Sequence, residues 1–191
     1  MTLRTGTRTR LLAGAVALAA LGLAGGPGHT APAPSAPKVP DAIQVPQGET
    51  LVLVGHASGS QIYTCSEAAD GKWQWTLKAP DAELRDDKGT VVIHHFAGPT
   101  WQHSDGSEVT GKAVGRTASP DADAIPWLLL SAVSHEGSGV LAHVTSIQRI
   151  NTHGGQPPPA AECAAAKRGA EARVAYTADY YFYAPAGGAA H

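Results

Sequence analysis

The sequence predicts an all-β domain, either an antiparallel β-sandwich or a closed β-barrel, with at most one or two short helices. Hydrophobic residues recur mostly with a period of two between residues 43 and 184, which is the period of a half-buried strand. Glycine-rich turns separate these segments. Helical patterns are scarce: the clearest is the Ala-rich stretch 160–172, which follows three consecutive prolines. Many short strands joined by such turns are typical of sandwiches and barrels.

The chain begins with the pattern of a secretory signal peptide. Three arginines in the first ten residues precede an uncharged apolar run of 14 residues, Leu11–Ala24, and then small residues and prolines. A membrane-spanning helix needs roughly 20 apolar residues, so we expect no stable membrane anchor. Residues 1–31 therefore predict a secreted or extracytoplasmic protein, with cleavage between about Ala24 and Ala33.

The remaining chain divides by composition into three parts. Residues 32–42 are rich in Pro and Ala, which predicts a disordered linker. Residues 43–184 have the length of one β domain. Residues 185–191 are rich in Ala and Gly and predict a flexible tail.

The first strands of the domain follow from short alternating segments. Residues 49–55 and 60–65 are expected to pair around a turn at Ala57-Ser58-Gly59. Residues 72–78 place Trp73, Trp75 and Leu77 on one face and polar residues on the other, which indicates a half-buried antiparallel strand.

Later strands are predicted at 90–93, after the turn 86–89, and more weakly at 107–117. Residues 126–134 fit either a helix that begins at Pro126 or a buried strand. The longest candidates are 140–150 and 173–183, and the second places five apolar residues on one face: Val174, Tyr176, Ala178, Tyr180 and Phe182.

Charge and motifs exclude several functions. The formal net charge is −2, and beyond the first 31 residues 11 basic side chains face 16 acidic ones. This balance disfavours nucleic acid as a partner, because such proteins need a basic face. Neither a G-x-G-x-x-G fingerprint nor a phosphate-binding loop occurs in the sequence, so we expect no cofactor.

The two cysteines, Cys65 and Cys163, predict a disulfide, because an even pair in an exported chain usually forms one. A redox or metal pair is the alternative. Cys65 and Cys163 lie far apart in the sequence and do not have the C-x-x-C spacing that redox and metal sites usually use.

The segment around His95 carries the best candidates for chemistry. A three-residue hairpin loop at 97–99 would place His95 opposite Trp101 and Ile93 opposite His103. His95 and His103 would then be diagonal neighbours roughly 7–8 Å apart, and with Asp105 they could ligate a metal. The alternative, which we favour, is that the histidines pack on Trp101 or face solvent.

Other catalytic patterns are weaker. No G-x-S-x-G motif marks a serine nucleophile, and Asp121 and Asp123 are more simply acids of a solvated loop. Arg149, if it points inward, needs a buried anionic partner. A structural salt bridge is favoured over a substrate clamp.

Aromatic residues provide the binding hypothesis. Trp73, Trp75 and Tyr180 are expected in the core. Trp101 lies in a Gly-Pro loop beside polar residues, where rigid sheets usually carry function. The candidate ligand-binding residues are His95, Trp101, Asp105 and Trp127.

Five motifs together resemble a family of exported bacterial and fungal proteins catalogued as a domain of unknown function. They are Gln61-Ile62-Tyr63-x-Cys65, His95-x-x-Gly98-Pro99-Thr100-Trp101, Asp105-Gly106-Ser107, Ile125-Pro126-Trp127-Leu128-Leu129, and Val144-Thr145-x-Ile147-Gln148-Arg149-x-Asn151-Thr152-x-Gly154-Gly155. The resemblance spans roughly residues 45–183 and brings no catalytic residues. Some fungal relatives carry a malate dehydrogenase label, which this chain does not support because it lacks the nucleotide fingerprint and the βαβ pattern of a parallel sheet.

The sequence thus favours a non-enzymatic extracellular or envelope protein that binds a small molecule or a carbohydrate. One alternative is a metal-assisted or general acid–base hydrolase. Another is a secreted structural or interaction protein without a pocket, which would expose a flat apolar patch instead.

Overall fold

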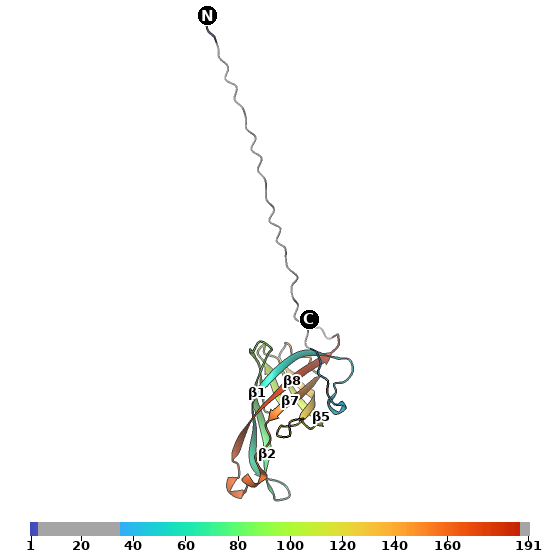
Figure 1. Cartoon of the computed structure of the whole chain (residues 1–191), viewed down its shortest axis with the longest axis vertical. Helices are drawn as coiled ribbons and strands as arrows, with labels where there is room; N and C mark the ends of the chain where they lie inside the picture. The colour runs from blue at the N-terminus through green and yellow to red at the C-terminus, as the bar shows by residue number, and fades with distance from the viewer. Residues whose placement is uncertain (4–34, 188–191) are drawn as a thin grey trace. The chain divides into compact units, whose positions relative to one another are not determined.

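The domain is a closed barrel of eight antiparallel strands in chain order (Figure 1). The computed structural model describes residues 1–3 and 35–187; most of the predicted signal peptide, its cleavage site and the end of the tail lie outside these residues. The barrel closes because the last strand pairs with the first, which decides between the barrel and the sandwich. The strands are β1 (Glu49–Glu67), β2 (Trp73–Arg85), β3 (Val91–Phe96), β4 (Thr100–His103), β5 (Glu108–Thr117), β6 (Trp127–Glu136), β7 (Ser146–Gly154) and β8 (Glu171–Pro185).

Helical structure in the described part of the chain is limited to three 3-10 turns, η1 (Asp41–Ile43), η2 (Ala160–Glu162) and η3 (Ala165–Lys167). The Ala-rich segment 160–172 therefore forms two single turns and the start of β8 instead of the helix that its composition suggests. None of the described helices has the length and apolar character needed to cross a membrane.

The predicted turn at Ala57-Ser58-Gly59 is wrong, because β1 runs through it as one strand of 19 residues. Gly59 has another purpose. A Cβ at this position would lie 2.2 Å from the backbone oxygen of Asp81 on β2. Glycine inside a strand often marks such a close backbone approach. Gly59 is therefore required for the close packing of β1 against β2 and does not form a turn.

Two further boundaries differ from the sequence prediction. Residues 126–134, which fit either a helix or a strand, contribute to β6. The predicted strand 140–150 begins only at Ser146, since residues 140–143 form a turn and residues 144–145 lead from it into β7. This segment supplies Leu141 and Val144 to the core, where both side chains are fully buried.

The two ends of the barrel are built differently. At one end, side chains from all around the ring form the core, among them Leu84, Ile93, Val109, Ile147 and Phe182. At the other end β1, β2 and β8 continue past the ring as a three-stranded extension (Figure 1), because β3 pairs only with residues 82–85 of β2. Trp73 and Trp75 lie in this extension, and they are half-buried there and not in the core.

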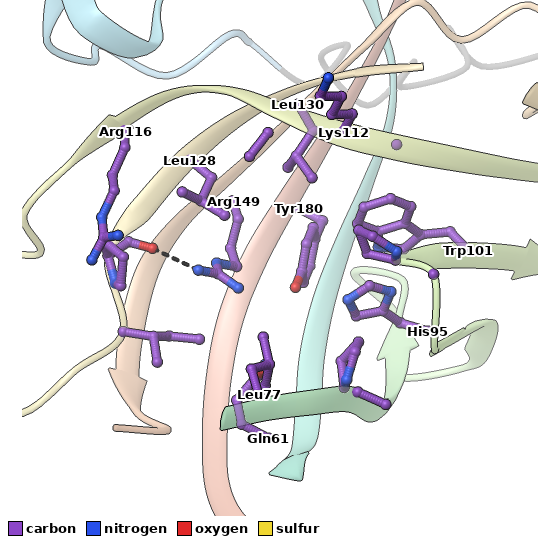
Figure 2. Close-up of a pocket in the computed structure, with 18 of the residues that line it drawn as sticks. Gln61, Leu77, His95, Trp101, Lys112, Arg116, Leu128, Leu130, Arg149 and Tyr180 are labelled. Atoms are coloured by element: carbon purple, nitrogen blue, oxygen red, sulfur yellow. Dashed lines mark hydrogen bonds between the residues drawn. The ribbon is translucent and has the colours of Figure 1, made fainter. Parts of the chain in front are cut away.

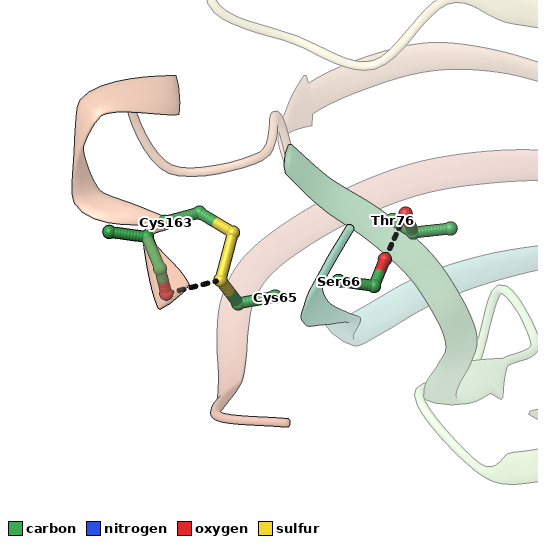
Figure 3. Close-up of a disulfide and its surroundings, with 5 residues drawn as sticks. Cys65, Ser66, Thr76 and Cys163 are labelled. Atoms are coloured by element: carbon green, nitrogen blue, oxygen red, sulfur yellow. Dashed lines mark hydrogen bonds between the residues drawn. A yellow bond between two sulfur atoms is a disulfide. The ribbon is translucent and has the colours of Figure 1, made fainter. Parts of the chain in front are cut away.

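The predicted disulfide is present and lies at the tip of this extension. Cys65, near the end of β1, is bonded to Cys163, between η2 and η3 (Figure 3). The bond fastens the long β7–β8 connection to β1. Gln156 and Pro157 of that connection border the cavity described next.

Candidate functional site

A cavity of about 1070 Å³ lies inside the barrel and opens at the end that carries the extension. Its deeper wall includes buried side chains such as Trp101, Tyr180 and Leu130. Its outer wall includes Leu77 and Val114, which are 52% and 60% exposed. The volume slightly exceeds the usual range for small-molecule sites, about 300–1,000 Å³.

The β3–β4 hairpin supplies one wall of the cavity, and its register agrees with the prediction. His95 pairs with Trp101 and Ile93 with His103. The His95 and Trp101 rings are stacked with centroids 4.3 Å apart, and Tyr180 of β8 meets the edge of both rings. Gly111 on β5 makes room for this stack, since a Cβ there would lie 3.1 Å from the Trp101 ring.

His95 is held as a neutral imidazole. Its Nδ1 lies 2.8 Å from the backbone oxygen of Thr100. A carbonyl oxygen only accepts hydrogen bonds, so Nδ1 carries the proton and Nε2 is left as an acceptor. Burial lowers the pKa of His95 from 6.5 to about 3. His95 is therefore suited to hydrogen bonding and not to proton transfer near neutral pH.

Arg149 on β7 points into the barrel, opposite Leu128 and Tyr180 (Figure 2). Its Nη2 donates a hydrogen bond to the backbone oxygen of Pro126 at 2.9 Å. Its Nε is buried without an acceptor. None of the carboxylates in the described residues pairs with it, so the salt bridge that the sequence favoured is not formed.

Two more buried nitrogens of the lining have no acceptor among the described residues: Nε2 of Gln61 on β1 and Nε1 of Trp101. Both side chains are at most 2% exposed. Buried donors are nearly always paired, and leaving one unpaired costs about 1–3 kcal/mol. Together with Arg149 Nε, the lining residues carry three unpaired N–H groups that are covered by neighbouring side chains.

The charged side chains of the lining are all basic. They are Lys78 on β2, Lys112 and Arg116 on β5, and Arg149. Lys78 is paired with Glu171 across the extension, whereas Lys112 and Arg116 make no ion pair with any residue described by the structure.

Asp105 lies away from the mouth, because β4 runs from the cavity-lining hairpin loop towards the other end of the barrel. Its carboxylate accepts hydrogen bonds from the backbone and hydroxyl of Ser107 and from the backbone of Val140. Burial opposes its ionisation, but these hydrogen bonds outweigh burial and lower the pKa of Asp105. Asp105 thus ties the β4–β5 turn to the β6–β7 connection.

The metal site that the sequence offered as the less favoured hypothesis, His95, His103 and Asp105, is not assembled. His95 is stacked in the cavity wall, while Nδ1 of His103 accepts a hydrogen bond from the backbone of Asp105. Across residues 1–3 and 35–187, no three His, Cys, Asp or Glu side chains are grouped so that they could hold a metal ion.

The four candidate ligand-binding residues therefore separate. His95 and Trp101 line the cavity, but Asp105 and Trp127 do not. Trp127 begins β6 opposite Thr117 and is half-buried. No sequence pattern indicated that Gln61 lines a cavity, and the prediction placed Tyr180 in the core alone. It also favoured a structural salt bridge for Arg149 over a contact with a ligand. The available signal was the position of Arg149, two residues after the apolar Ile147 on the inward face of one strand.

Comparisons with known proteins add the family but no activity. Neither the curated proteins nor the solved structures contain a match to this chain. Residues 46–184 match a family described as "Protein of unknown function (DUF3455)". This match covers most of the chain and nearly the whole barrel, and the chain belongs to the DUF3455 family.

Proposed function

We propose that this domain is an extracytoplasmic binding protein that holds a small organic molecule inside the barrel. The observation that carries the proposal is the cavity of about 1070 Å³, whose wall combines apolar side chains such as Leu128, Leu130 and Tyr180 with the basic side chains of Arg116 and Arg149. Ligand sites are mostly apolar and contain a few convergent polar groups, and the mouths of barrels are a common place for them.

The composition of the wall favours binding over catalysis. The only lining imidazole is His95, whose pKa is lowered to about 3 by burial. It would be a poor general acid or base near neutral pH. The largely apolar wall also suits a molecule with an apolar or aromatic body better than a sugar, which needs many hydrogen-bonding partners.

The extracytoplasmic location rests on the amino-terminal pattern and on the disulfide. The apolar run 11–24 follows basic residues, and the Cys65–Cys163 bond is of the kind that persists in oxidising compartments. Sequencing the amino terminus of the protein recovered from the extracytoplasmic fraction tests this part. A mature chain that begins between residues 25 and 34 supports it, and an intact chain retained in the cytoplasm contradicts it.

Binding is tested with N-phenylnaphthylamine, a neutral dye that fluoresces in apolar sites. We expect saturable binding of one dye per chain, with energy transfer from tryptophan. Ala113→Trp should strongly reduce this binding, because Ala113 lines the cavity opposite Leu130 and an indole there would occupy part of the space that the dye needs. Gln102→Trp is the matched control, since Gln102 is exposed on β4 and does not line the cavity.

The two variants make the outcome decisive once circular dichroism shows that both are folded. Strongly reduced binding in Ala113→Trp with retention in Gln102→Trp supports the proposal. The proposal is overturned if both variants bind the dye equally well. It is also overturned if the parent protein binds neither this neutral dye nor the anionic dye anilinonaphthalene sulfonate.

A further inference from the structure

We infer that the cavity selects an organic anion, with the acidic head group held by Arg149 and the apolar body against Tyr180, Trp101 and Leu128. This inference rests on the proposed function and specifies its ligand class. The ligand is identified by its chemistry, namely an oxyanion such as a carboxylate or sulfonate on an apolar, preferably aromatic, body.

The first observation is the sign of the charge in the cavity. Four basic residues and no acidic residue line it, although acidic side chains outnumber basic ones in the chain as a whole, with 16 against 14. The lining therefore differs in sign from the protein around it. A cleft of one sign raises the local concentration of ligands of the opposite sign.

The second observation is the hydrogen bonding of Arg149. A guanidinium has five N–H donors in a planar fork, and within the described residues only Nη2 of Arg149 finds an acceptor, the Pro126 oxygen. That bond fixes the fork in the cavity, as Figure 2 shows. The remaining N–H groups on Nη1 and Nη2 can therefore meet a two-oxygen acceptor, for which the guanidinium fork is well matched.

The third observation is that the other basic side chains of the lining lie at the outer, exposed part of the cavity. Lys112 and Arg116 are exposed on β5, at the outer part of the cavity. Both lack an ion-pair partner in the described residues. Lys78 is already neutralised by Glu171. Arg116 is thus placed to attract an anion, and the half-buried Arg149 is placed to bind it, because exposed charges affect encounter more than affinity.

The fourth observation is the apolar surface beside Arg149. Tyr180 is paired with Arg149 across β7 and β8, and Leu128 is paired with it across β6 and β7. Trp101 lies beyond Tyr180, at 5.6 Å between ring centroids. A ligand whose head reaches Arg149 would lay a planar body along these side chains.

The test compares two dyes that share one body. Anilinonaphthalene sulfonate carries a sulfonate, and N-phenylnaphthylamine is its neutral counterpart. In a purely apolar cavity the neutral dye binds more tightly, since the sulfonate must be desolvated. We expect the opposite order for this protein, with the anionic dye bound more tightly and its affinity falling as salt is raised.

Arg149→Met removes the proposed head-group contact and keeps an apolar stem. We expect the affinity for the anionic dye to fall by about tenfold to a hundredfold, as for loss of a charge-assisted hydrogen bond. The affinity for the neutral dye should change by less than about threefold. Arg149→Lys should keep part of the preference. Lys88→Met is the control, because it removes an equal charge from the β2–β3 turn, outside the cavity.

The outcomes separate this inference from the proposed function. If both dyes bind in the cavity with the neutral one preferred, or if Arg149→Met leaves the anionic dye unaffected, the anion inference is overturned and the binding proposal stands. If neither dye binds the parent protein, both fail. Should Arg149→Met not fold, the dye preference and salt dependence of the parent protein decide the question.

Discussion

His95 stacks on Trp101 across the β3–β4 hairpin, with ring centroids 4.3 Å apart and ring planes inclined by only 8°. The pair belongs at once to the core and to the cavity wall, because both side chains are at most 2% exposed and both line the cavity. The hairpin register produces this contact, since the two residues are directly opposite each other. Stability and ligand binding are therefore coupled at this pair.

Trp101→Ala should lower the free energy of unfolding by about 3–5 kcal/mol, as large-to-small changes of buried aromatic residues do. The same change should weaken dye binding, because the indole forms part of the wall. Chemical denaturation gives the first quantity and fluorescence titration the second. Trp101→Phe retains a ring and should cost clearly less, and an equal cost for both variants would contradict the packing described here.

His95 should make the protein less stable as the pH falls. Burial lowers its folded pKa to about 3 from 6.5, so between these values the unfolded chain binds a proton that the folded protein does not. The free energy of unfolding must then decrease from pH 6.5 towards pH 3, by an amount of the order of a few kcal/mol.

The contribution of His95 is isolated by comparison with His95→Gln, which keeps a polar side chain without the titration. The difference in unfolding free energy between the two proteins, measured at several pH values, should change in this interval. A constant difference would show that His95 is not buried in its neutral form.

His56 should have the opposite dependence and a smaller effect. It bridges Asp179 at 2.6 Å and Asp87 at 3.0 Å. The hydrogen bonds that its ring donates to these carboxylates, above all the one to Asp179, raise the pKa of His56. Its stabilising contribution is full below pH 6.5 and is lost as the pH rises through the raised pKa.

The size of the His56 effect is limited by solvent, because its side chain is 47% exposed. We expect no more than about 1 kcal/mol, removed by His56→Gln and reduced by high salt. NMR titration of the His56 ring gives its pKa directly, and a value at or below that of a free histidine would refute the bridge.

The disulfide should stabilise the barrel and hold the rim of the cavity. Replacing Cys65 and Cys163 by serine should lower the unfolding free energy by about 2–5 kcal/mol. It should also weaken binding of the neutral dye, because Gln156 and Pro157 border the cavity on the connection that the bond anchors. If thermal denaturation shows the loss of stability but binding is unchanged, the bond supports the fold alone.

Much of the fold was predictable because the alternation of strands and the hairpin loop are local properties of the sequence. Four residues of the predicted inward face of β8, Tyr176, Ala178, Tyr180 and Phe182, are buried, and the 97–99 loop fixes the partners of His95. Gly59 misled the prediction because a glycine demanded by a neighbouring strand looks the same in the sequence as a glycine demanded by a turn.

The site was harder to predict because it is assembled from distant strands. Asp105 was grouped with His95 from their closeness in sequence, but the direction of β4 separates them. Arg149 was expected to find a carboxylate, since a charge inside a protein usually does. The residues that face Arg149 are determined by the way β6, β7 and β8 pair to close the barrel. No local pattern in the sequence contains that information.

A crystal structure of the protein soaked with anilinonaphthalene sulfonate would test the central claim most directly. The account predicts one dye molecule inside the barrel, with a sulfonate oxygen within hydrogen-bond distance of the Arg149 guanidinium and the rings against Tyr180 and Trp101. A dye bound only on the outer surface, or a cavity filled by rearranged side chains, would contradict it.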